Sequence, residues 1–222
     1  MKKYVSLFLI LAMIAVSLTA CGEKKPNTSG SGSTASAEPI DTAQVDKAKV
    51  LESITTDEIA GETVFIAEDG AIQVGYVEDF SESYYDENEL KEFIEDELGS
   101  AGKLEAIDTK DGKVRVILSF KDADAYNAYE KEIGSVSVAV ITANEAMMSY
   151  KATPFHDAKN VAAAMKTGQE VIDADKYQAV VVTGPVNVVT AGKVAWYSQG
   201  NLSGERTLTL DDGVTAVILF SK

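Results

Sequence analysis

The sequence contains one cysteine and one histidine in 222 residues. Cys21 has no second thiol in the chain, so an intrachain disulfide is excluded. His156 is the only imidazole, which excludes the usual zinc sites built from several histidines and cysteines. A folded part of about 180 residues buries about 70% of the surface that its unfolded chain exposes, so a core is expected without either kind of cross-link. The sequence therefore predicts no metal ion and no cofactor.

Basic charge is scarce as well. The chain has 20 lysines and arginines against 35 aspartates and glutamates, a net charge of −15. Without residues 1–20, which hold Lys2 and Lys3 and no acid, 18 basic residues face 35 acidic ones and the net charge is −17. A domain of this charge is repelled by the phosphates of nucleic acids and by anionic lipid headgroups. We therefore exclude a nucleic-acid partner and attribute most of the acidity to solubility.

A long hydrophobic run is also missing. The longest, from Val5 to Leu18, has 14 residues and is interrupted by Ser6 and Ser17. A membrane-spanning helix needs about 20 apolar residues, so this run is short for a permanent span. With the two lysines before it, residues 1–20 are typical of a secretory signal peptide.

The signal ends in Leu18-Thr19-Ala20-Cys21, which resembles the lipobox of bacterial lipoproteins. The resemblance implies that Cys21 receives a diacylglycerol and that the signal is cleaved after Ala20. Two acyl chains anchor a protein stably, whereas one chain gives only marginal binding. The implied partner is membrane lipid through diacylglyceryl-Cys21, and the implied location is the outer face of the cell membrane.

Residues 21–45 are expected to form a flexible tether behind the lipidated cysteine. Between Pro26 and Glu38 no apolar side chain is larger than alanine, so the segment has too little to bury to become ordered. Such a coil spans about 25–30 Å on average. Apolar residues return from about Ala43, and we predict an extracytoplasmic head over residues 46–222. The pattern changes after Pro154, which leaves a sub-boundary near residue 150 open.

The first part of the head is predicted to be hairpin–helix–hairpin–helix. Asp69-Gly70 and Asp111-Gly112 are favoured hairpin turns, and each separates two β-favouring runs. Between the hairpins, Asp86 is a candidate N-cap. An apolar stripe of Leu90, Phe93, Ile94 and Leu98 follows it, and Gly99 can end the helix in the left-handed conformation. A second helix is predicted over residues 122–134, followed by a strand from 136 to 141.

The second part is predicted to be mostly antiparallel β. Residues 176–220 hold four or five short β runs, separated by Gly184-Pro185, Ala191-Gly192 and Asp212-Gly213. Residues 155–172 fit either a helix or a hairpin. The predicted fold class is therefore α+β, with a hairpin–helix–hairpin–helix part followed by a mostly antiparallel β C-terminal part.

Two longer stretches, residues 74–98 and 180–198, are similar to segments of small uncharacterised lipoproteins of Gram-positive anaerobic gut bacteria. They read VGYVEDFSESYYDENELKEFIEDEL and VVVTGPVNVVTAGKVAWYS. The resemblance implies an outer-face membrane location and assigns no activity to any residue.

Two aromatic pairs are the candidate ligand contacts. Trp196 and Tyr197 are adjacent in a strand pattern, so their rings point to opposite faces of a sheet. One ring is expected to be buried, and the other, if exposed, can stack on a sugar. Tyr84 and Tyr85 precede the first helix, where they form either an exposed contact pair or a hydrophobic staple. For both pairs a purely structural role is the favoured alternative.

Residues 78–97 carry ten carboxylates, opposed only by Lys91. Calcium takes several carboxylate oxygens, so a calcium site is one hypothesis. The stretch lacks the spacing of a calcium-binding loop, and a solvated helix face is the favoured hypothesis. His156 lies beside Asp157, but no strained serine motif accompanies them, and the sequence predicts no catalytic residue.

Together these features predict a non-enzymatic, membrane-tethered extracytoplasmic lipoprotein. Its head is expected to be a binding or envelope-interaction module whose partner is a protein, a glycan or a wall component. The alternative is an extracytoplasmic hydrolase or wall-modifying enzyme that uses carboxylates. That alternative requires a pocket in which two acids have well-separated pKa values.

Replacing Cys21 by alanine removes the thiol to which lipid is predicted to attach. We expect Cys21→Ala to abolish incorporation of a labelled fatty acid and to move the protein out of the membrane fraction of cells. Ala37→Ser, a change within the tether, serves as the control and leaves both readouts intact. Labelled, membrane-bound Cys21→Ala protein would show that the anchor hypothesis is wrong.

Overall fold

A computed structural model describes residues 51–134 and 136–222. The signal peptide, the lipobox residues Leu18, Thr19, Ala20 and Cys21, and the tether lie outside the described residues.

Helices and sheets are both present, which confirms the α+β class. The helices are the 3₁₀ helix η1 (Thr56–Glu58) and the α-helices α2 (Glu87–Leu98), α3 (Ala123–Ile133), α4 (Ala143–Tyr150) and α5 (Gly168–Val171). The strands are β1 (Thr63–Ile66), β2 (Ile72–Asp79), β3 (Lys103–Lys110), β4 (Lys113–Phe120), β5 (Ser137–Ile141), β6 (Pro154–Asp157), β7 (Lys166–Thr167), β8 (Tyr177–Thr183), β9 (Val186–Thr190), β10 (Val194–Tyr197), β11 (Asn201–Leu202), β12 (Thr207–Leu210) and β13 (Thr215–Ser221).

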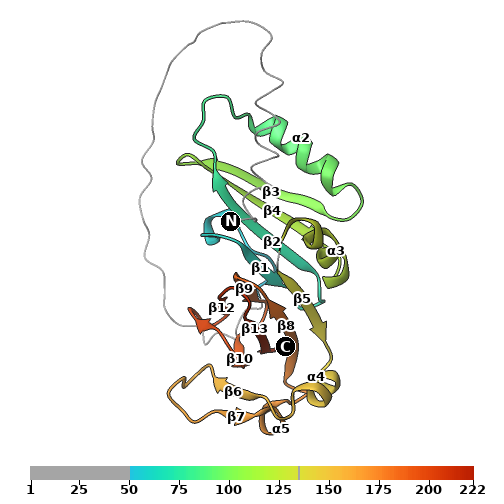
Figure 1. Ribbon diagram of the computed structural model, residues 1–222, viewed down its shortest axis with the longest axis vertical. Coiled ribbons are helices and arrows are strands. Elements are labelled where there is room, and N and C mark those ends of the chain that lie inside the picture. Colours follow the sequence, from blue (N-terminus) through green and yellow to red (C-terminus); the bar gives the residue numbers. More distant parts are fainter. Residues whose placement is uncertain (1–50, 135) are drawn as a thin grey trace, which may run out of the picture.

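The strands form two sheets that follow one another along the long axis of the molecule (Figure 1). A seven-stranded sheet has the order β11-β12-β9-β1-β2-β4-β3, and a six-stranded sheet has the order β5-β8-β13-β10-β6-β7. Both sheets contain strands from either side of residue 150. Strand β1 pairs with β9 in parallel and with β2 in antiparallel orientation.

The C-terminal part is mostly antiparallel, as predicted. It holds six strands between residues 177 and 221 rather than four or five. The additional strand is β11, which has two residues and is too short to show an alternating pattern. The ambiguous segment 155–172 contains both options: β6 pairs with β7 as a hairpin, and the single helical turn α5 follows.

Helix α2 begins and buries one face as the sequence indicates. The carboxylate of Asp86 accepts hydrogen bonds from the backbone N–H groups of Asn88 and Glu89, so it satisfies two donors of the first turn. Leu90, Ile94 and Leu98 are buried, whereas Phe93, the fourth residue of the predicted stripe, is partly exposed. The prediction for Gly99 was wrong in one respect. Its φ is 49° but its ψ is −117°, outside the left-handed helical region, although the positive φ still favours glycine.

Both predicted turns require positive φ. Gly70 has a φ of 88°, and Asp111 and Gly112 have φ values of 56° and 71°. Positive φ at both central residues, the conformation that matches the twist of a two-residue hairpin, is thus found at Asp111-Gly112. In the longer first loop only Gly70 has positive φ, so the expectation for Asp69 was wrong.

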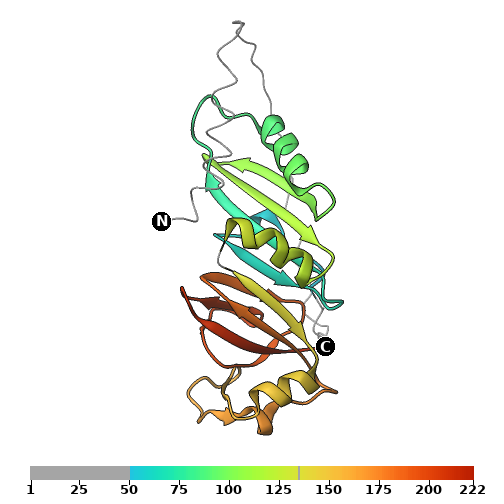
Figure 2. The same cartoon turned by 45° about the vertical axis from the view of Figure 1, so that its right-hand side comes forward.

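Helices α2 and α3 cover one face of the seven-stranded sheet (Figure 2). The main core lies beneath them and continues into the six-stranded sheet. It joins Val64 and Leu118 to residues as distant in sequence as Val180 and Ile218. Fragment 46–222 contains every residue of this core and of the two smaller clusters, so it keeps all of the described packing.

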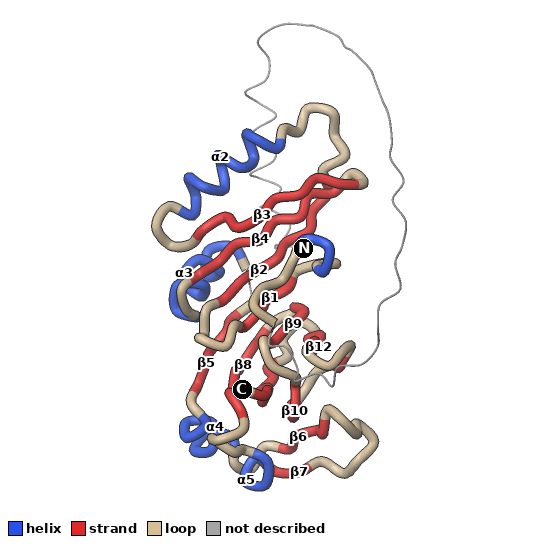
Figure 3. The backbone as a smooth tube through the Cα atoms, turned by 180° about the vertical axis from the view of Figure 1, so that it is seen from behind, coloured by secondary structure: helices blue, strands red, loops and turns tan. Residues whose placement is uncertain are grey.

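Residues 51–60 form an N-terminal strap across the opposite face of the same sheet, seen from behind in Figure 3. Ile54 and Ile59 of the strap are buried against Phe65 of β1. A Cβ at Gly75 of β2 would lie 2.7 Å from the Ile59 side chain, so glycine at this position lets the strap approach the sheet.

Helix α4 was absent from the sequence-based prediction. It begins at a capping box in which Glu145 accepts hydrogen bonds from the backbone and hydroxyl of Thr142, and the Thr142 hydroxyl accepts from the Glu145 N–H. Only Ala146 is fully buried in it, so the apolar periodicity that marks longer helices is weak here.

A buried carboxylate lies among core tyrosines. Glu130 of α3 is 2% exposed, and the Tyr76 hydroxyl donates a hydrogen bond to it over 3.2 Å. Burial, and then the charge of Glu130, raises the pKa of Tyr76 and of Tyr126 well above the usual value. The same two causes raise the pKa of Tyr129 to about 12.

We expect these tyrosines to make the fold sensitive to alkali. Between about pH 10 and 12 the unfolded chain loses phenol protons that the folded chain retains, so stability falls as the pH rises through this window, by about 2 kcal/mol for Tyr129 alone. Absorbance at 295 nm should therefore rise together with the loss of the circular dichroism signal. Tyr129→Phe should weaken this pH dependence. Full ionisation of all tyrosines near pH 10 with an intact fold would contradict the prediction.

Candidate functional site

A cavity of about 660 Å³ lies between the N-terminal strap and the loop that joins β11 to β12. It is lined by Leu51, Ile54, Glu58, Ala60, Thr63, Asn187, Val189, Glu205, Arg206 and Thr207. This volume falls within the range of small-molecule sites, which is about 300–1,000 Å³.

The floor of the cavity is the outer face of three paired strands. Thr63 of β1 is the register partner of Asn187 of β9, and Val189 of β9 is the partner of Thr207 of β12. Successive strand residues face opposite sides of a sheet. The intervening Val188 therefore points into the main core, where it is fully buried. The residues that face the cavity from β1, β9 and β12 are therefore polar at Thr63, Asn187 and Thr207 and apolar at Val189.

Asn187 is held in place on this floor. Its backbone N–H donates to the Glu62 carbonyl over 3.0 Å, and its side-chain oxygen accepts a hydrogen bond from the Thr209 hydroxyl over 2.9 Å. Because these contacts tie β1, β9 and β12 together, the amide is presented from a rigid surface.

The strap forms one wall. The backbone N–H of Leu51 donates to the Ala191 carbonyl over 3.0 Å, and the N–H of Ile54 donates to the Gln73 side chain over 3.1 Å. Glu58 accepts two hydrogen bonds of 2.8 Å from Thr55, which close the turn of η1. The carboxylate of Glu58 thus holds the strap in shape at the rim of the cavity.

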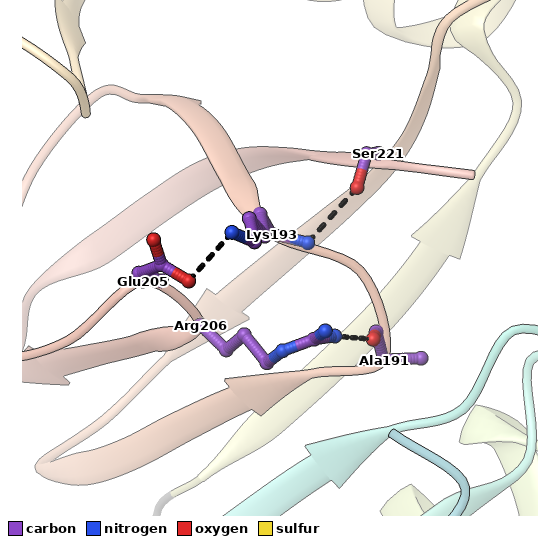
Figure 4. Close-up of polar contacts among 5 residues, drawn as sticks. All are labelled: Ala191, Lys193, Glu205, Arg206 and Ser221. Atoms are coloured by element: carbon purple, nitrogen blue, oxygen red, sulfur yellow. Dashed lines mark hydrogen bonds and ion pairs between the residues drawn. The ribbon is translucent and has the colours of Figure 1, made fainter. Parts of the chain in front are cut away.

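The opposite wall carries charges of both signs (Figure 4). The guanidinium of Arg206 donates to the Ala191 carbonyl, and Lys193 pairs with Glu205 over 2.7 Å. The backbone N–H of Lys193 also donates to the Ser221 hydroxyl over 2.9 Å. The hydrogen bond and charge of Lys193 lower the pKa of the Glu205 carboxyl, which therefore stays ionised at neutral pH.

The cavity combines apolar walls with a cation, two carboxylates, hydroxyls and an amide. Both lining carboxylates already hold structural contacts, Glu58 to the strap and Glu205 to Lys193. The arrangement suits reversible binding of a polar ligand with an apolar part.

The residues predicted as ligand contacts lie elsewhere. Trp196 and Tyr197 of β10 face opposite sides, as expected: Tyr197 is 3% exposed, and Trp196 is partly exposed. The Lys166 ammonium group lies 5.4 Å from the centre of the Trp196 ring, so a sugar stacking on this face would compete with it. His156 stacks on Tyr197 at 5.2 Å.

Tyr84 and Tyr85 lie in the connection between β2 and α2. Tyr84 is 45% exposed, whereas the ring of Tyr85 packs on Phe80 at 5.0 Å and so lies beside the core. The two tyrosine rings meet edge to face at 4.9 Å. None of the four predicted aromatic contacts lines the cavity.

The acidic stretch 78–97 comprises the end of β2, the loop after it and α2. Eight of its ten carboxylates are exposed, while Glu78 and Glu89 are half-buried. Within residues 51–134 and 136–222, no three histidine, cysteine, aspartate or glutamate side chains form a group that could hold a metal ion. Asp122 and Asp173, two further acids, accept local backbone hydrogen bonds at a helix start and at a turn.

The cavity-lining residues escaped the sequence analysis because they are far apart in the chain. One available signal was the alternation of polar and apolar residues in Thr207-Leu208-Thr209-Leu210, which places both threonines on one face. Nothing local indicates that the strap covers that face.

We compared the chain with protein-family models, curated proteins and solved structures. No protein-family model, no curated protein and no solved structure matches the chain. Among the residues that the structure describes, no helix is both long and apolar enough to cross a membrane.

Proposed function

We propose that the chain is a membrane-tethered extracytoplasmic lipoprotein whose head binds a small ligand in the cavity beneath the strap. The head combines the hairpin–helix–hairpin–helix part with the antiparallel β part. The tether and anchor follow from the lipobox-like sequence at Leu18–Cys21 and the small polar residues after it. The cavity of about 660 Å³ is the observation that carries the binding function.

The lining indicates the class of ligand. Leu51, Ile54 and Val189 offer apolar contacts, whereas Arg206 and the carboxylates offer charges of both signs. A ligand that carries an apolar part together with amino and carboxyl groups matches this lining, as a short wall peptide does. Neutral glycans match the hydroxyl and amide groups only. We therefore place wall peptides before glycans among the candidate ligands.

The position of the cavity also fits a tethered receptor. Leu51 lies at its rim and is the first described residue after the predicted tether. Binding at the strap would therefore act on the segment through which the head is connected to the membrane.

A thermal-shift screen of fragment 46–222 against wall peptides, glycan fragments and Ca²⁺ tests the proposal. A ligand that binds only the folded state stabilises it by about 2.7 kcal/mol at a hundredfold excess over Kd. In a domain of this size that corresponds to a rise in Tm of about 5–10 °C. We expect a wall peptide to produce such a rise and Ca²⁺ to produce none.

The variant Ala60→Phe tests whether the ligand binds in the cavity or elsewhere on the head. Ala60 is exposed at the rim, so a phenyl group there obstructs part of the cavity without disturbing the core, and the ligand-induced shift should fall sharply. Ala101→Phe, at an equally exposed alanine after α2, is the matched control and should keep the shift. A shift that survives Ala60→Phe would place the ligand elsewhere, and a screen without any shift would count against the binding function.

A further inference from the structure

The connection between β6 and β7 exposes an apolar tip. It runs through Ala158-Lys159-Asn160-Val161-Ala162-Ala163-Ala164-Met165, and we call residues 158–167 the lysine-flanked loop. Every residue from Lys159 to Thr167 is exposed, and Val161 and Met165 are each 53% exposed. Val161 and Met165 are two of the five large apolar side chains that are exposed in the described residues, and exposed apolar side chains that lie together indicate a contact site.

The backbone of this loop is fixed at its base. The N–H of Ala158 donates to the Ala195 carbonyl over 3.0 Å, and the N–H of Lys159 donates to the Asp157 carboxylate over 2.8 Å. A turn follows, in which the N–H of Ala163 donates to the Asn160 carbonyl over 2.9 Å. The fold therefore presents the apolar tip outward from a defined turn.

The charge of the loop differs from that of the whole chain. Lys159 and Lys166 flank the tip, and no acid lies between residues 158 and 167. The acids at the two ends of the loop are Asp157 and Glu170, whose carboxylates accept hydrogen bonds from the backbone N–H groups of Lys159 and Thr167. The ten carboxylates of residues 78–97 lie at the α2 end of the long axis, whereas β6 and β7 lie at the other end (Figure 1). Charges further apart than about 8 Å are largely screened at physiological salt, so the carboxylates at the α2 end do not act on Lys159 and Lys166.

These features select a lipid surface as the partner. A stable protein interface buries about 800 Å² on each side. A tip of five residues, three of which are alanines, supplies less area than that. Insertion at a bilayer surface needs only a few apolar side chains with cations beside them, and anionic headgroups attract each lysine.

We propose that the lysine-flanked loop inserts its apolar tip into the anionic phospholipid surface to which the chain is anchored. The inference rests on the tethered location in the proposed function. The predicted tether comprises residues 21–45, and a flexible coil of that length spans about 25–30 Å on average. At such an effective concentration even a weak insertion is populated.

The chain supplies both an attachment point and a reporter for the test. Chain 21–222 is coupled through Cys21, its only thiol, to a maleimide lipid in vesicles. Trp196, the only tryptophan, lies beside Lys166 at the end of the loop. Vesicles whose acyl chains carry bromine quench its fluorescence on insertion. We expect strong quenching with phosphatidylglycerol present and several-fold less with phosphatidylcholine alone.

Two variants and a control assign the effect to the loop. The double variant Val161→Asp/Met165→Asp should lower the inserted fraction about tenfold, because charged side chains resist transfer from water. Lys159→Gln should reduce quenching only in phosphatidylglycerol vesicles. Tyr84→Asp changes a residue of similar exposure near the start of α2 and should have no effect. Circular dichroism melts check that every variant folds.

Quenching that the double variant leaves unchanged would overturn the proposal, as would its absence in the wild-type chain. Sedimentation that shows a dimer abolished by the same variant would assign the tip to a second copy and would also overturn it. Because the coupling is chemical, the result does not depend on lipidation of Cys21 in cells. Ligand binding in the cavity is measured separately, so failure of either proposal is distinguishable.

Discussion

The parallel pairing of β1 with β9 joins the first and last parts of the described chain. The two strands are more than a hundred residues apart in sequence, yet they lie in register from Thr63↔Asn187 to Ile66↔Thr190. Because β1 also pairs with β2, and β9 with β12, this contact makes one seven-stranded sheet out of two antiparallel sets. Without it the main core would divide between the two sets.

Central strands that are covered on both faces are mostly apolar. All four residues of β1 are buried: Val64 and Ile66 point into the main core, and Phe65 points to the opposite face. The strap covers this opposite face by placing Ile54 and Ile59 over Phe65. The strap does not cover β12, and the cavity lies between the strap and the part of the sheet that it leaves uncovered. The candidate site is thus a consequence of how the sheet is completed.

Local chemistry explains which features were predictable. The N-caps Asp86 and Asp122 and the two Asp-Gly turns act within a few residues, so their effect is visible in the sequence. Helix α4 carried the same kind of signal in Thr142 and Glu145, but its short and poorly periodic apolar face concealed it. The partner of β1, the path of the strap and the cavity depend on contacts between distant segments. No short motif encodes them.

The longest run of carboxylates and the exposed apolar tip lie at opposite ends of the long axis, and this arrangement has a physical consequence. An acidic domain near an anionic surface is repelled, but the repulsion decays within about 8 Å, so it acts on whichever end is nearest. With the carboxylates of residues 78–97 at one end and the lysine-flanked loop at the other, the least repelled orientation directs the loop to the surface. Net charge alone therefore misleads for this chain. With the chain anchored as proposed, the distribution of charge would decide how the head stands on the membrane, and the exposed tip is the proposed contact.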